Sequence, residues 1–69
     1  MTSLSLTILN DAGLLRAYVV EHYGHLYAGA FGCSLAVRSA ERLVRRLSRL
    51  TGLSVASIAA DIAADYESQ

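Results

Sequence analysis

One stretch near the middle of the chain constrains the fold more than any other, because its apolar residues recur with the period of a helix and then stop at a glycine. Within residues 34–50 the apolar side chains step by four and three residues, which places them on one helix face. These positions are Ala36, Ala40, Leu43, Leu47 and Leu50, with Val37 and Val44 beside them. Thr51-Gly52 ends the pattern, since glycine tolerates the left-handed conformation that follows a helix. We therefore predict a helix from about Ser34 to Leu50.

Two further helices flank this one. Asn10-Asp11 is a suitable helix start, and the apolar spacing after it predicts a helix from about Asp11 to a point between Gly24 and Ala30. Its periodic positions are Leu14, Leu15, Tyr18, Val19, His22 and Leu26. Ser54 is expected to cap a third helix. The buried face of that helix would consist of Val55, Ile58, Ala59, Ile62 and Ala63.

The small residues of segment 28–34 predict a turn, with Ser34 capping the helix that follows. Under the alternative, the first helix continues through this segment. Gly24, Ala28 and Gly32 would then lie four residues apart and let another backbone approach closely. We prefer the turn.

Residues 3–9 alternate polar and apolar side chains, the period of a half-buried strand. A lone strand has no partner in its own chain, so it would pair with its twin across a dimer axis. The alternatives are an extended arm and the first turn of a helix. We predict a strand or extended arm over residues 1–10.

The size of the chain conflicts with its hydrophobicity. Sixty-nine residues form at most one domain, and a core of that size is marginally stable alone. Cys33 is the only cysteine, so no internal disulfide can form, and no zinc-ligand spacing occurs. Yet 54% of the residues are hydrophobic, which a shared core would explain. We predict a mostly α single domain with a homodimeric core: a short N-terminal extended segment or strand, then three helices.

No uncharged apolar run reaches the ~18 residues that span a bilayer. Asp11, Arg16 and Glu21 interrupt the most hydrophobic half of the chain. The N-terminal residues MTSLSL lack the basic region of a signal peptide. We expect a cytoplasmic protein that does not insert into membranes.

Charge is balanced overall but unevenly placed. Five of the six arginines lie in residues 38–49, and Arg38, Arg42, Arg45 and Arg49 form one stripe along the predicted helix, with Arg46 beside it. Glu41 precedes Arg45 by four residues, a favourable pairing. Asp61 and Asp65 are expected to face arginines of the same helix or of the other subunit. The remaining arginines would be available to an acidic partner.

Two DNA-binding architectures are compatible with parts of the pattern. Residues 47–62 have the skeleton of a helix-turn-helix, but the second helix would expose Ser54, Ala56, Ser57, Ala60 and Asp61, which cannot read base edges. A ribbon-helix-helix dimer would use the strand at residues 3–9, which carries no cation to neutralise phosphates. DNA binding is therefore the weaker interpretation.

The residues for catalysis or metal binding are few. His22 and His25, with Glu21, supply only two histidine ligands, which do not close a metal site. Cys33 lies among small apolar residues without a nearby cation. We predict neither an enzyme nor a cofactor. Tyr18, Tyr23 and Tyr27 form a cluster suited either to packing or to a protein interface.

The whole chain resembles the family of small phage-encoded quorum-sensing anti-activators in its length and in the segments LNDAGLLRAYVVEHYGHLYAG and AERLVRRLSRL. The resemblance implies an inhibitor of host proteins made by a temperate phage. Its targets would be a LuxR-type transcriptional activator, which is kept off its promoters, and the ATPase that assembles type IV pili. Blocking the ATPase would deny other phages their receptor.

These expectations converge on stoichiometric inhibition of a host regulator by direct binding. The predicted contacts are Arg42, Arg45, Arg49, Tyr23 and Tyr27. The alternatives are a small DNA-binding repressor, of ribbon-helix-helix or helix-turn-helix type, and a structural assembly protein.

Overall fold

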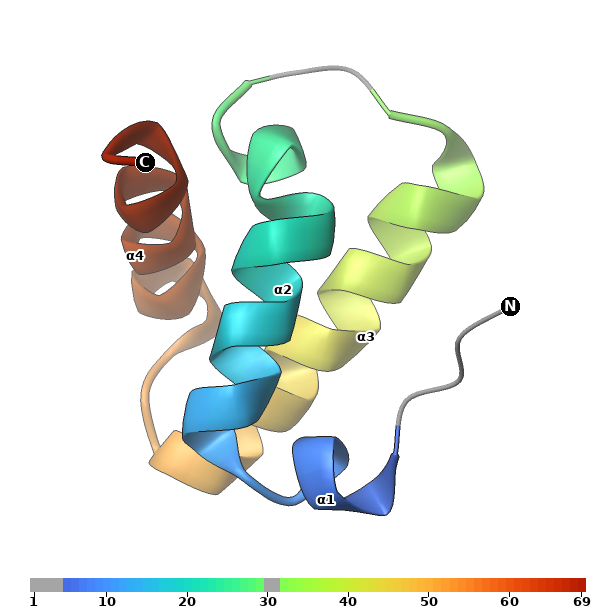
Figure 1. The fold of residues 1–69 in the computed structure, drawn as a ribbon, viewed down its shortest axis with the longest axis vertical. Coiled ribbons are helices and arrows are strands. Elements are labelled where there is room, and N and C mark those ends of the chain that lie inside the picture. Colours follow the sequence, from blue (N-terminus) through green and yellow to red (C-terminus); the bar gives the residue numbers. More distant parts are fainter. Residues whose placement is uncertain (1–4, 30–31) are drawn as a thin grey trace.

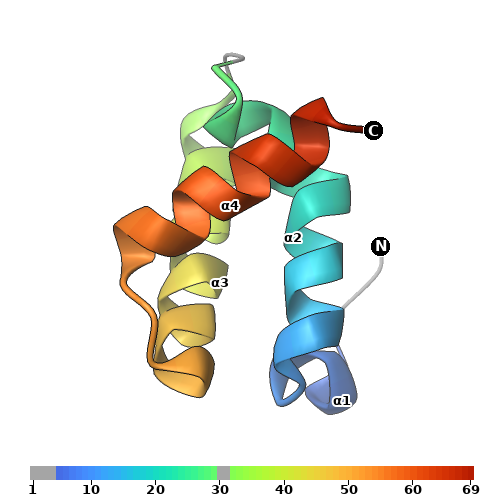
Figure 2. The same cartoon turned by 90° about the vertical axis from the view of Figure 1, so that its left-hand side faces the viewer.

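The computed structural model describes residues 5–29 and 32–69, which form four helices. They are α1 (Leu6–Leu9), α2 (Ala12–Tyr27), α3 (Ser34–Thr51) and α4 (Val55–Glu67). The antiparallel helices α2 and α3 lie next to each other, and α4 packs across one side of the pair (Figures 1 and 2). The prediction of a mostly helical fold is confirmed.

Side-chain caps determine where the longer helices begin. The Asp11 carboxylate accepts the Leu14 N–H at 3.1 Å, and the Ser54 hydroxyl accepts the Ser57 N–H at 3.1 Å, as the sequence predicted. The expected cap of α3 was wrong by one residue. Cys33 is the cap, and its Sγ accepts the Ala36 N–H at 3.4 Å.

A three-residue corner joins α3 to α4. Gly52 has a φ of 77°, the left-handed conformation predicted for it, and its N–H donates to the Ser48 carbonyl at 2.9 Å. The Ser48 hydroxyl in turn donates to the Leu53 carbonyl at 2.6 Å. Across this corner the chain bends by 111°. No single helix in the described residues is long and apolar enough to cross a membrane, although the bent pair α3 and α4 together has that length and composition.

The core lies where α2, α3 and α4 meet. Its buried side chains are Leu15, Val19, Val20, Ala40, Leu43, Val44, Leu47, Ile58 and Ile62. All of these except Val20 lie on the predicted apolar faces, but His22, which was predicted on the first of those faces, is exposed and Tyr18 is only partly buried. Positions at the ends of those faces are not buried, because Leu50 and Val55 flank the corner and are 41% and 46% exposed.

The predicted N-terminal strand is wrong for residues 6–9, which form a helical turn; residues 1–4 lie outside the described part of the chain. The Ser5 hydroxyl caps this turn by accepting the Ile8 N–H at 3.3 Å. A strand would leave its backbone groups unpaired without a partner strand, whereas a helical turn satisfies them locally. Ile8 and Leu9 also pack against the core together, which strict alternation would prevent.

The turn predicted between the first two long helices is confirmed, since α2 ends at Tyr27 and Gly29 has a φ of 98°. Gly24 is nevertheless a site of close approach, but to a side chain. It is buried against Tyr66 of α4, and a Cβ atom at Gly24 would lie 2.7 Å from Cδ1 and 2.9 Å from Cβ of that tyrosine.

Replacing Gly24 with alanine should therefore destabilise the protein, by about 1–3 kcal/mol as in other overpacked sites. Helix propensity alone predicts the opposite sign, a gain of roughly 0.8–1.0 kcal/mol. Gly13→Ala is the control within the same helix, because its Cβ would have Asp11 Oδ1 at 3.4 Å as its nearest neighbour. Urea denaturation would measure the stability of both variants. If Gly24→Ala were as stable as Gly13→Ala, the close contact between Gly24 and Tyr66 would be contradicted.

Candidate functional site

The exposed face of α3 carries the arginine stripe predicted from the sequence, opposite the buried face. Arg38, Arg42, Arg45 and Arg49 are all exposed. The predicted Glu41–Arg45 pair is present, but its atoms are 3.9 Å apart and both side chains are more than half exposed. Among the described residues it is the only ion pair that an arginine of this stripe makes. Such an exposed pair contributes about 0.3–0.5 kcal/mol and leaves the stripe strongly positive.

The acids of α4 do not neutralise this stripe, which corrects the expectation that Asp61 and Asp65 face α3. Both pair with Arg16 of α2. Its Nε lies 2.8 Å from Asp61 Oδ2 and its Nη1 lies 2.8 Å from Asp65 Oδ2. Hydrogen bonding to Asp61, and then to Asp65, raises the pKa of Arg16 although partial burial opposes this. The sequence signal was present: two acids four residues apart require a cation, and Arg16 is the only one outside α3.

Arg46 is separated from the stripe by its contacts with α1. Its Nε donates to the Leu9 carbonyl at 2.6 Å, and its Nη2 donates to the Asn10 side-chain oxygen at 2.8 Å. These bonds join the end of α1 to α3. They also position Leu9 at the edge of a surface hollow described next.

The first hollow, which we call the α2–α3 hollow, brings two of the predicted contact residues together. It has a volume of about 290 Å³ and is lined by Leu9, Tyr23, Ser39, Arg42 and Leu43. Tyr23 and Arg42 come from different helices, so the sequence did not show that they meet. Ser39 was not predicted. A guanidinium and two hydroxyl groups beside leucine side chains suit a carboxylate attached to an apolar segment.

Tyr27 lies in a separate, smaller hollow of about 120 Å³ with Glu41 among its lining residues. Burial, and then the negative charge of Glu41, raise the pKa of the Tyr27 hydroxyl. Tyr23 is instead near Tyr18, with ring centroids 6.4 Å apart. The structure thus divides the predicted tyrosine cluster, and it places Arg45 and Arg49 on the stripe outside both hollows.

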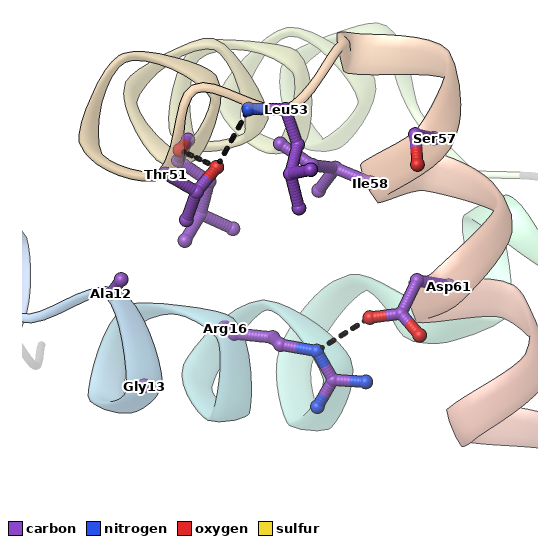
Figure 3. Close-up of a pocket in the computed structure, with 9 residues that line it drawn as sticks. Ala12, Gly13, Arg16, Thr51, Leu53, Ser57, Ile58 and Asp61 are labelled. Carbon is purple, nitrogen blue, oxygen red and sulfur yellow. Dashed lines mark hydrogen bonds and ion pairs between the residues drawn. The ribbon is translucent and has the colours of Figure 1, made fainter.

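A larger cavity lies inside the corner between α3 and α4 and was not predicted (Figure 3). Its volume is about 450 Å³, and we call it the corner cavity. Its lining residues are Ala12, Gly13, Arg16, Leu47, Thr51, Leu53, Ser57, Ile58 and Asp61. The Arg16–Asp61 ion pair lies at one side and Leu53 faces it from the other.

The two histidines considered as metal ligands lie beside aromatic rings, whereas the lone cysteine is a helix cap. His22 stacks on Tyr18 at a centroid distance of 4.2 Å, and His25 lies 6.4 Å from the Tyr66 ring. Cys33 is exposed at the start of α3. Within residues 5–29 and 32–69, no three His, Cys, Asp or Glu side chains are grouped so that they could hold a metal ion.

Comparisons of the chain with protein-family models, with curated proteins and with solved structures found no match.

Replacing Arg46 with methionine should release α1 and cost about 1.5–3 kcal/mol, the usual range for hydrogen bonds to a charged group. Arg45→Met is a matched control, since it removes the same charge from the adjacent residue but breaks only an exposed pair. Hydrogen exchange should show loss of protection at Leu9 and Asn10 for Arg46→Met alone. Equal protection in the two variants would contradict the anchoring contact.

The raised pKa of Tyr27 gives a pH-dependent prediction. A group whose folded-state pKa lies above its unfolded value stabilises the protein below the unfolded value, and that contribution is lost as pH rises through the folded pKa. Stability should therefore fall above the ordinary tyrosine pKa of 10.0. The fall should be smaller in Tyr27→Phe, as measured by urea denaturation across alkaline pH, with Tyr18→Phe as the control.

Proposed function

We propose that this protein is a non-enzymatic inhibitor that binds an acidic surface of another protein through α3 and the adjacent α2–α3 hollow. The proposal is supported by the arginine stripe, in which only Arg45 has an ion pair among the described residues and Arg42 shares the α2–α3 hollow with Tyr23. Arginine forms paired hydrogen bonds with carboxylates, and arginine and tyrosine are enriched among the residues that dominate protein interfaces. Arg45 and Arg49 would extend the contact along α3, and Tyr27 would contribute at its edge.

The host targets that we propose are those implied by the resemblance described above. The first is a LuxR-type activator, whose DNA binding would be blocked. The second is the type IV pilus assembly ATPase. Inhibition would occur in the host cytoplasm, at one inhibitor chain per bound surface, and the inhibitor would act as a homodimer.

A DNA-binding repressor is the second candidate, and the corner between α3 and α4 favours it. A bend of 111° and a three-residue turn containing glycine match a helix-turn-helix. The chemistry of α4 is unfavourable, because its exposed Ala56, Ser57 and Ala60 cannot read bases and Asp61 would repel phosphates. The ribbon-helix-helix alternative requires a strand at residues 3–9, but residues 6–9 form a helical turn.

The proposal is tested by capture from host lysate with and without nuclease, followed by calorimetry with the purified activator and ATPase. Binding that survives nuclease is expected. Arg42→Gln should weaken binding about 5- to 30-fold, in line with the 1–2 kcal/mol typical of an interface contact residue. Tyr23→Ala should weaken it similarly.

Ala60→Glu is the matched charge control. This substitution also lowers the net charge by one, but Ala60 is an exposed residue of α4 and does not line the α2–α3 hollow. If Ala60→Glu weakened binding as much as Arg42→Gln, the effect would be one of overall charge and the α2–α3 hollow would not be the contact. Capture of DNA alone would instead favour the repressor.

A further inference from the structure

We infer that the corner between α3 and α4 is the surface through which two copies of this chain associate. The corner surface consists of the exposed aliphatic residues Leu50, Leu53 and Val55 together with the mouth of the corner cavity. This inference gives the proposed homodimer a location. It does not depend on the identity of any host target.

The corner surface carries a projection and a recess next to each other. Leu53 is 54% exposed although it also lines the corner cavity, so it stands at the rim. Leu50 and Val55, which flank the corner in sequence, are 41% and 46% exposed and add to its apolar surface. A two-fold dimer uses the same surface on both copies, so each feature of that surface must fit another feature of the same surface. Leu53 of each copy can enter the cavity of the other.

The floor of the recess is apolar, which suits an aliphatic occupant. Leu47 and Ile58 line the cavity and are 2% and 5% exposed, so they belong to the core. The Thr51 hydroxyl is already satisfied, because it donates to the Leu47 carbonyl at 2.8 Å and accepts the Leu53 N–H at 3.2 Å. An incoming leucine would therefore extend the core without burying an unpaired hydroxyl at this position.

Charge distinguishes this surface from the rest of the molecule. Two ionised groups line the cavity, Arg16 and Asp61, and they form an ion pair at 2.8 Å. Arg16 also pairs with Asp65, which does not line the cavity, so the three groups together carry a single negative charge. Because the lining residues themselves are balanced in charge, two such surfaces repel each other far less than two arginine stripes would. The exposed face of α3 cannot do so, because a two-fold contact there would bring like arginines together.

The small core of a single copy also favours association, which would bury further apolar surface. Its core contains nine buried apolar side chains, and its surface is 4690 Å². A stable dimer of standard size buries about 800 Å² per partner, roughly one sixth of that surface. In the part of the chain that the structure describes, the other exposed leucines, Leu6, Leu14 and Leu35, line none of the three hollows.

Sedimentation velocity over a concentration series tests the inference on the full chain. The wild type should sediment at twice the mass of the 7.4-kDa chain. Leu53→Asp should shift it to the mass of one chain by placing a charge in the partner's cavity. Gly13→Leu should do the same from the other side, because Gly13 lines the recess and the nearest atom to an added Cβ, Asp11 Oδ1, lies at an ordinary contact distance of 3.4 Å.

Leu35→Asp is the control, since Leu35 is 74% exposed at the opposite end of α3 and should leave the dimer intact. Circular dichroism would verify that each variant remains folded. A wild type that is monomeric throughout would overturn the inference. So would a dimer that persists in both Leu53→Asp and Gly13→Leu, or one that Leu35→Asp also dissociates. A dimer of this kind that binds no host protein would support this inference while refuting the proposed function.

Discussion

The corner at Gly52 determines the arrangement of the whole molecule. A residue with a side chain is strained in the left-handed conformation found there, and without that conformation α3 would not end where it does. The 111° bend directs α4 back across α2 and α3. Only then can Ile58 and Ile62 reach Leu15 and Val19 and complete a core. In a chain of this size, no other core is available to compensate for its loss.

The same corner also decides how charge is distributed. Because α4 crosses α2, Asp61 and Asp65 meet Arg16 and not the arginines that precede the corner in sequence. The formal net charge of zero therefore conceals a strongly positive α3 and an excess of acids elsewhere, including an α2–α4 contact in which two aspartates share one arginine. Near the end of this contact, Tyr66 packs on Gly24, which lets the two helices approach closely. Overall composition gave no indication of this division, since it depends on which helices are neighbours.

Local signals in the sequence predicted the local structure well. The caps at Asp11 and Ser54, the left-handed Gly52 and the centres of the apolar faces each depend on a few neighbouring residues. The errors arose where distant contacts decide. Residues 6–9 alternate like a strand, but packing of Ile8 and Leu9 and two hydrogen bonds from Arg46 favour a helical turn. The meeting of Tyr23 with Arg42, and the corner cavity, likewise need the relative positions of helices that periodicity does not give.

The two proposed surfaces have complementary physical roles. Arginine–carboxylate contacts that stay exposed to solvent contribute only about 0.2–1 kcal/mol each, so the stripe residues outside the α2–α3 hollow would add little to the affinity of one chain. The proposed association through the apolar corner would leave both stripes exposed and place them on one body. A second contact with the same target is then intramolecular, and its effective concentration can raise the overall affinity by factors of about 10² to 10⁴. The apolar corner would thus make a weakly binding charged face effective without any further contact residue.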